Sequence, residues 1–114
     1  MSSRANPSKL NALQLKTLAI LQEVARSGGD VSEELADGSV ALNRLPHAHG
    51  DHFHVGSAVV RAKDATGLGN PGVFGALRRK GLIAMAPDGR PALTAAAMSY
   101  ETGVAEAILH RSDH

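Results

Sequence analysis

The sequence predicts a single small α+β domain, and three observations carry that prediction. The length of 114 residues is about the modal size of one compact domain. Hydrophobic residues make up 43% of the chain and charged residues 20%, a globular rather than a disordered balance. Stretches of helical periodicity are interrupted by short stretches bounded by turn residues, so both helices and strands are expected. Because aromatic residues make up only 3%, the core should consist of Leu, Val, Ile and Ala.

The ends and the composition of the chain indicate a cytoplasmic protein. We expect one domain over residues 9–110, with flexible ends at residues 1–8 and 111–114. No apolar run approaches the roughly 18 residues of a membrane span, and residues 1–7 lack the apolar stretch of a secretion signal. The chain contains no cysteine, which excludes disulfides and thiolate metal sites. We therefore expect no contact with a membrane.

The first half of the chain predicts one helix followed by an extended hairpin. Apolar residues recur every three or four positions over Leu10–Ala25, and Ser27-Gly28-Gly29 ends the pattern, so an amphipathic helix is expected. The acidic stretch that follows indicates a connector with a helical turn at Ser32–Leu35. Val40–Val55 is expected to be extended, with Gly50-Asp51 as a two-residue turn.

The second half of the chain predicts three helices and one hairpin. Asn70 and Pro71 supply an N-cap and a first-turn proline, which start a helix that Gly81 ends. In order, we expect a helix at Ser57–Ala65, a turn at Thr66–Gly69, a helix from Pro71 to Lys80, strands at Leu82–Met85 and Pro91–Leu93 joined by the turn Pro87–Arg90, and a helix from Thr94 to about His110. The chain then reads helix, strand, helix, helix, strand, turn, strand, helix.

This order and its local motifs resemble the winged helix-turn-helix regulators of the MarR and ArsR kind. The resemblance covers roughly residues 57–97, and it is carried by Ala65–Val73, Ala76–Ile83, Asp88-Gly89-Arg90 and Leu93-Thr94. It implies a small winged-helix domain with three core helices, a wing hairpin, and a C-terminal helix used for dimerisation. It also implies double-stranded DNA as a partner and a homodimer that pairs through the C-terminal helix.

Basic residues concentrate in the part of the chain that carries this resemblance. Residues 57–91 hold six basic and two acidic side chains, a net charge of +4, whereas the rest holds six basic and nine acidic ones. Lysine and arginine there could neutralise phosphates and release counterions. The expected recognition helix has few donors for base reading, since glycines occupy its first turns. The expected DNA-binding residues are Arg61, Lys63, Asn70, Arg78, Arg79, Lys80 and Arg90.

Four of the chain's six histidines fall within residues 47–54, and no other stretch is as unusual. Imidazole is a common ligand of zinc and other divalent transition metals. Cross-strand partners share a face, so on the predicted hairpin His49 would face His52 and His47 would face His54. We expect these four imidazoles to lie on one face and to bind zinc or a similar ion. Asp51 would lie at the turn or orient an imidazole. The alternative is a solvated hairpin whose histidines bind water, or phosphate when protonated.

The pattern H-x-H-x-D-H in this run also resembles the dinuclear-metal motif of the metallo-β-lactamase superfamily. That resemblance would make His47, His49, Asp51 and His52 metal ligands, with activated water performing hydrolysis. The superfamily fold is far larger and takes further ligands well downstream, so we expect no enzyme. The expected function is a DNA-binding transcriptional regulator, metal- or pH-responsive through the histidine-rich hairpin. Two alternatives stay open: a winged-helix module that binds protein without binding DNA, and a small metal-dependent hydrolase.

Overall fold

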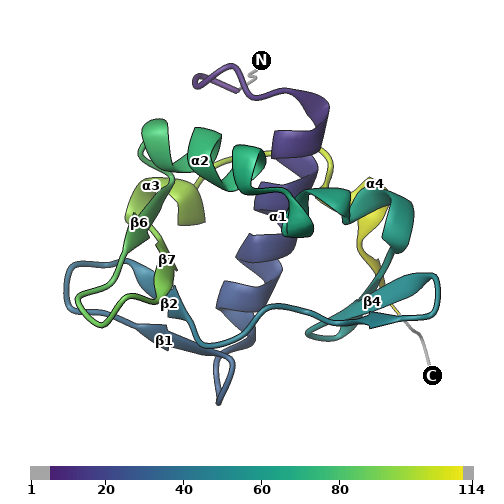
Figure 1. Cartoon of the computed structure of the whole chain (residues 1–114), viewed down its shortest axis with the longest axis horizontal. Coiled ribbons are helices and arrows are strands. Elements are labelled where there is room, and N and C mark those ends of the chain that lie inside the picture. Colours follow the sequence, from purple (N-terminus) through teal and green to yellow (C-terminus); the bar gives the residue numbers. More distant parts are fainter. Residues whose placement is uncertain (1–5, 112–114) are drawn as a thin grey trace.

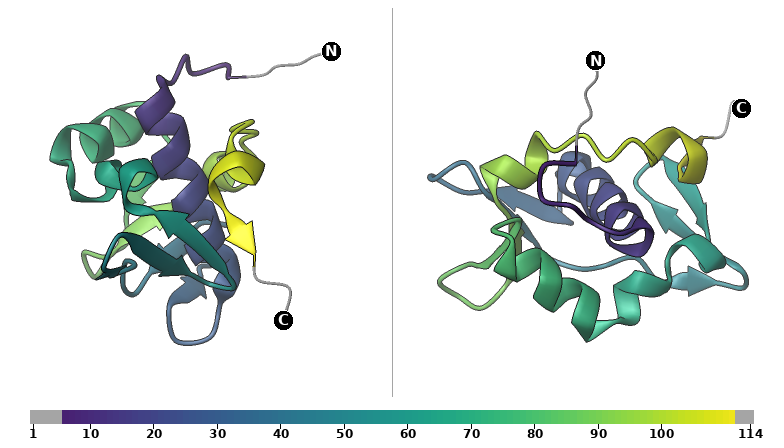
Figure 2. Two further views of the ribbon diagram at one scale, coloured as in Figure 1. Left: turned by 90° about the vertical axis from the view of Figure 1, so that its right-hand side faces the viewer. Right: turned by 90° about the horizontal axis from the view of Figure 1, so that it is seen from above.

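The helix α1 (Ala12–Ser27) runs through the middle of the molecule, with one antiparallel sheet on each side (Figures 1 and 2). The computed structural model describes residues 6–111. The Asn11 side chain accepts a hydrogen bond from the Gln14 backbone N–H at 2.8 Å, and the Gln14 side chain accepts one from the Asn11 N–H at 3.0 Å. This capping box starts the helix, and Gly28 at φ +64° ends it. The helix predicted at Leu10–Ala25 is thus confirmed, with both ends slightly further along the chain.

The first sheet has the strand order β1-β2-β7-β6. Its strands are β1 (Ser32–Glu34), β2 (Val40–Leu42), β6 (Ile83–Met85) and β7 (Pro91–Leu93). The hairpin predicted at residues 82–93 is confirmed, and it pairs with β2 through Val40 opposite Leu93. The helical turn predicted at Ser32–Leu35 is wrong. Ser32 starts a strand instead, because its buried hydroxyl donates to the Ala25 carbonyl of α1 at 2.9 Å and fixes the chain beside β2.

The second sheet has the strand order β3-β4-β5-β8 and is also antiparallel. Its strands are β3 (Ala48–His49), β4 (His52–Val55), β5 (Ala58–Arg61) and β8 (His110–Arg111). The turn predicted at Gly50-Asp51 is confirmed, because His49 pairs with His52 across it and Gly50 has the φ of +67° that such a turn requires. The histidine-rich run is therefore a hairpin at one edge of this sheet.

The helix predicted at Ser57–Ala65 is wrong, because this segment continues the second sheet as β5. Val59 and Val60 are β-branched residues, which favour strands over helices. Gly56, at φ +59°, allows the chain to fold back so that Val55 lies opposite Ala58. Helical geometry is confined to the 3-10 turn η1 (Ala62–Asp64). The expected helix-turn-helix thus lacks its first α-helix in this segment.

The helix predicted from Pro71 to Lys80 is confirmed as α2 (Pro71–Arg79). The Asn70 side chain accepts a hydrogen bond from the Gly72 N–H at 2.9 Å and caps the first turn, as expected. The turn predicted before it is a short 3-10 helix, η2 (Thr66–Gly69), which packs on α1. Buried Val73 and Leu77 hold α2 on the core.

The single helix predicted from Thr94 to His110 is wrong, because the chain leaves the helical path after one capped turn. The amide of Gln22, buried in α1, donates to the carbonyls of Ala97 and Tyr100 at 2.8 Å each, so it takes acceptors that a continuing helix would use. Gly103 then turns the chain at φ +75°. The segment is divided into α3 (Ala95–Met98), α4 (Ala105–Ile108) and β8. Residues 94–111 therefore form no continuous helix through which the expected homodimer could pair.

One core joins α1 to both sheets and to α2. Fully buried side chains of these four parts of the molecule meet in it: Leu18, Ile20, Leu21, Val60, Leu77 and Leu93. The prediction of a small α+β domain with an aliphatic core is confirmed.

Part of the predicted flexible N-terminus is held by hydrogen bonds. The Tyr100 hydroxyl donates to the Asn6 side chain at 2.6 Å and accepts from the Ser8 N–H at 3.1 Å, while the Lys80 ammonium donates to the Ser8 carbonyl at 2.8 Å. Of the predicted flexible C-terminus, Arg111 belongs to β8. Residues 1–5 and 112–114 lie outside the described residues. Within residues 6–111, no helix is long and apolar enough to span a membrane.

Candidate histidine-rich binding site

The second sheet turns one face to the core and the other to solvent. Partners across an antiparallel ladder share a face, and the face alternates along each strand. Val60 is fully buried and pairs with Phe53, so the neighbouring pairs on β4 and β5 point outward. These pairs are His52 with Arg61 and His54 with Val59, and Val59 also pairs with His110 of β8. The outer face therefore carries His52, His54, Val59, Arg61 and His110.

Three imidazole rings of the hairpin lie close together on this face. The ring centres of His49 and His54 are 5.0 Å apart, those of His52 and His54 are 5.0 Å apart, and those of His49 and His52 are 6.4 Å apart. The His52 Nδ1 lies 3.4 Å from a carboxylate oxygen of Asp51, the turn residue. The prediction that the hairpin gathers imidazoles on one face is confirmed for these three.

His47 has a different position, because β3 begins only at Ala48. It lines a hollow of about 330 Å³ together with His49 and His54, against Val24 and Ser27 near the end of α1. Among the described residues, no group of three or more His, Asp or Glu side chains is arranged to hold a metal ion as those side chains stand. The four predicted ligands are thus neighbours, but their nitrogen atoms do not converge on one point.

A second hollow, of about 670 Å³, lies on the other side of His52 and is rich in cations. Two basic residues, Arg61 and Lys63, line it. Two imidazoles line it as well, whereas the only carboxylate in its lining belongs to Asp51. The residues that surround this hollow are Asp51, His52, Val59, Arg61, Ala62, Lys63 and His110. We call it the cationic hollow.

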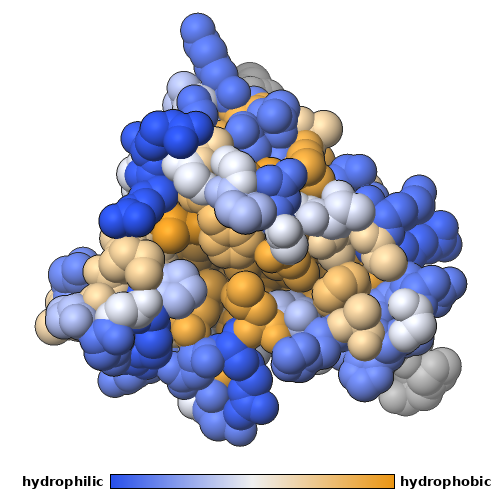
Figure 3. Space-filling model, in the orientation of Figure 1, coloured by the Kyte–Doolittle hydropathy of each residue, from blue (hydrophilic) through white to orange (hydrophobic). Residues whose placement is uncertain are grey.

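The remaining predicted DNA-binding residues lie on α2 or on the β6–β7 turn. Arg78 and Arg79 are exposed in the last turn of α2. The Asn70 side chain is occupied by the cap of the same helix, and the Lys80 ammonium is bonded to the Ser8 carbonyl. Figure 3 shows hydrophilic residues over the second sheet and over the far end of α2, with apolar residues between them. The predicted cations thus form two separate groups.

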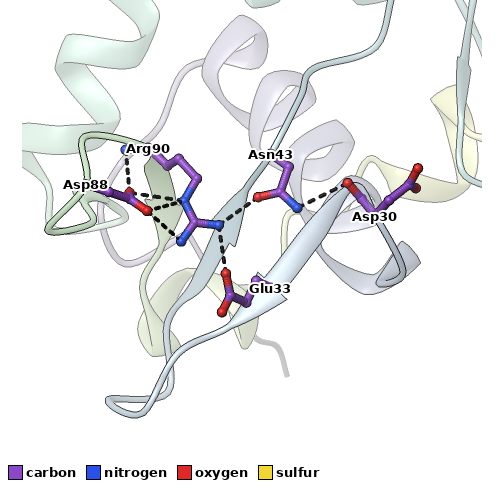
Figure 4. A network of polar contacts seen from close by, with 5 residues as sticks. All are labelled: Asp30, Glu33, Asn43, Asp88 and Arg90. Carbon is purple, nitrogen blue, oxygen red and sulfur yellow. Dashed lines mark hydrogen bonds and ion pairs between the residues drawn. The ribbon is translucent and has the colours of Figure 1, made fainter.

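Arg90 belongs to neither group, because its guanidinium is bound within the protein (Figure 4). It donates to the Asp88 carboxylate at 2.9 and 3.0 Å, to Glu33 of β1 at 2.8 Å and to the Asn43 side chain at 2.7 Å. The hydrogen bonds from Arg90 hold the pKa of the Asp88 carboxyl below its ordinary value of 3.8. The same bonds raise the pKa of Arg90 itself. Arg90 ties the β6–β7 turn to β1, which leaves it poorly placed to contact DNA.

Sequence reasoning assigned His52 to a metal site and Arg61 and Lys63 to DNA binding, and it assigned no role to His110. The structure brings all four to one hollow, because β5 pairs with β4 and β8 pairs with β5. β8 is only two residues long, so no alternation in the sequence could reveal it. No protein-family model, curated protein or solved structure matches the chain.

Proposed function

We propose that the protein binds double-stranded DNA, mainly through phosphate contacts, as a regulator of the winged-helix type. The cationic hollow carries this proposal. Arg61 and Lys63 are basic residues on neighbouring elements, and a single carboxylate, that of Asp51, opposes them in the lining. Such a surface is suited to a polyanion, and phosphate neutralisation with counterion release provides most of the affinity of non-specific DNA binding.

The order of the elements supports the winged-helix part of the proposal. A first helix, a strand, a capped helix and an antiparallel hairpin occur in this order as α1, β2, α2 and β6–β7, with β1 inserted before β2, and the hairpin pairs with β2. Strands β3 to β5 and two 3-10 turns stand where the family has the helix before its recognition helix. In this arrangement α2 takes the place of the recognition helix, and the β6–β7 turn takes that of the wing.

The composition of α2 favours phosphate contacts over base reading. Asn70 is used as a cap, and Gly72 and Gly75 present no donor side chain to a groove. The exposed charges of the helix, Arg78 and Arg79, lie at its end. We therefore expect binding with weak sequence preference, in which Arg78 and Arg79 form a second contact with the backbone.

The test is fluorescence anisotropy of a labelled duplex at several salt concentrations, in the presence of EDTA so that no metal takes part. The wild-type affinity should fall steeply as salt rises. The double variant Arg61→Ala/Lys63→Ala should bind more weakly, and the slope of log K against log salt should fall by about 2.

A matched double variant controls for the loss of two charges. Arg26→Ala/Arg44→Ala removes two exposed guanidinium groups that do not line the cationic hollow. It should keep a salt slope close to that of the wild type. Absent or salt-independent binding by the wild type, or an equal loss of slope in both double variants, would overturn the proposal.

A further inference from the structure

We propose that His49, His52 and His54 bind one divalent transition-metal ion of the zinc class, independently of DNA. The two-residue turn fixes the backbone of the hairpin, so His49 and His52 lie directly opposite each other and His54 follows two residues later on the same face. Since the chain contains no cysteine, nitrogen and oxygen ligands are the donors it can offer such an ion.

The spacing of the rings agrees with a shared metal ion. Two imidazoles bound to one tetrahedral zinc ion through Zn–N bonds of about 2.0–2.1 Å have ring centres roughly 5 Å apart. Two of the three spacings in this cluster are 5.0 Å, and the third, between His49 and His52, is 6.4 Å. The His54 ring meets the other two edge to face, whereas His49 and His52 are nearly parallel, and the side chains must rotate before the nitrogen atoms converge. His49 and His54 are exposed, and exposed side chains change rotamer within nanoseconds.

The carboxylate of Asp51 supports a metal site independently of the ring spacing. It lies 3.4 Å from the Nδ1 atom of His52 and reaches no other ring nitrogen of the cluster in a hydrogen bond. A carboxylate on one imidazole nitrogen fixes the tautomer that leaves the other nitrogen free for a metal. His52 would thus bind through Nε2, with Asp51 orienting the ring.

The surroundings predict the affinity and the coordination of the site. Arg61 lies directly opposite His52 on β5, and its charge opposes a dication. Three protein ligands also leave a fourth position of a tetrahedral ion open for water or an anion. His110 lies on β8, about 10 Å from β4 because β5 intervenes. It lies outside the cluster of three rings on the hairpin and serves as the control.

The test is a calorimetric titration of the metal-free protein with zinc chloride near pH 7.5, followed by NMR of the imidazole rings. We expect one zinc ion per chain, with the ring signals of His49, His52 and His54 shifted. His54→Ala should lose this binding, Asp51→Asn should weaken it about 10- to 100-fold, and His110→Ala should leave it unchanged. Thermal unfolding without zinc shows whether His54→Ala is folded.

Arg61→Ala separates this proposal from the proposed function. It should bind zinc more tightly than the wild type and DNA more weakly, because it removes a positive charge from both sites. The two proposals can fail independently, because DNA binding is measured with EDTA present and zinc binding is measured in a separate titration. A wild type that fails to bind DNA would leave the zinc result unaffected. Failure of the wild type to take up zinc, or uptake that His54→Ala retains in full, would overturn the metal proposal.

Discussion

Gly67 of the 3-10 helix η2 lies against Thr17 and Leu13 of α1. A Cβ atom at this position would overlap the hydroxyl of Thr17, which is fully buried and donates to the Leu13 carbonyl at 2.8 Å. A hydroxyl that is already bonded inside a packed core cannot move aside at low cost. The absence of a side chain at Gly67 therefore sets how closely the two helices pack.

We predict that Gly67→Ala destabilises the protein by about 1–3 kcal/mol through this overlap. The control is Gly69→Ala in the same 3-10 helix, where a Cβ atom meets nothing within 4 Å. That variant should be close to neutral. Urea unfolding measures both, and equal midpoints for the two variants would contradict the interpretation.

The residues that sequence reasoning located correctly are those whose partners are close in the chain. Asn70 caps a helix through Gly72, and His49 meets His52 across a two-residue turn. The partners of Arg90 include Glu33, which is 57 residues away, and its position depends on the pairing of the first sheet. We expected Arg90 to contact DNA because its neighbours in the sequence predict only a turn and do not reveal these distant partners.

At the scale of elements, local pattern fails where a distant contact decides the structure. The segment Ser57–Ala65 has apolar residues at spacings that a helix can use, but nine residues are too few to separate the helical period from the strand period. Pairing with β4 makes it a strand. The break after α3 depends in the same way on Gln22, which is 75 residues from Ala97 along the chain.

The tie between the β6–β7 turn and β1 should depend on pH. The pKa of Asp88 is lower in the folded protein than its ordinary value of 3.8, because Arg90 donates hydrogen bonds to the carboxylate. A lowered pKa means that the stabilisation is fully present above about pH 4 and is lost as the pH falls through the folded pKa. Because both groups are at the surface, the effect on Tm should be small.

We therefore predict that Asp88→Asn lowers Tm near neutral pH, and that the difference from the wild type shrinks as the pH is lowered from about 6 to about 2. Glu34→Gln is the control, since it removes an exposed carboxylate of β1 that takes no part in the Arg90 bonds. Its difference from the wild type should lack this pH dependence. Thermal melting curves of the wild type and both variants at each pH test this. A Tm difference between Asp88→Asn and the wild type that stays constant with pH would contradict the prediction.

At the scale of the whole molecule, α1 packs against both sheets. Its buried face contributes Leu18, Ile20 and Leu21 to a core that also contains Val60 of the second sheet and Leu93 of the first. The sequence predicted this helix, the glycines that end it and the aliphatic core, because local periodicity and composition determine those features. It could not show that two sheets flank the helix, since the pairing of β2 with β7 and of β5 with β8 joins distant segments.

Because both sheets rest on one helix, we predict that they unfold together rather than as separate units. Leu18→Ala should destabilise the protein by about 2–5 kcal/mol and should speed amide hydrogen exchange in β2 and in β5 by the same factor. Leu15→Ala, at a half-buried position of the same helix, should have a smaller effect of the same kind. Exchange measured by NMR or mass spectrometry gives both factors. Protection that persists in one sheet after the other has lost it would contradict joint unfolding of the two sheets.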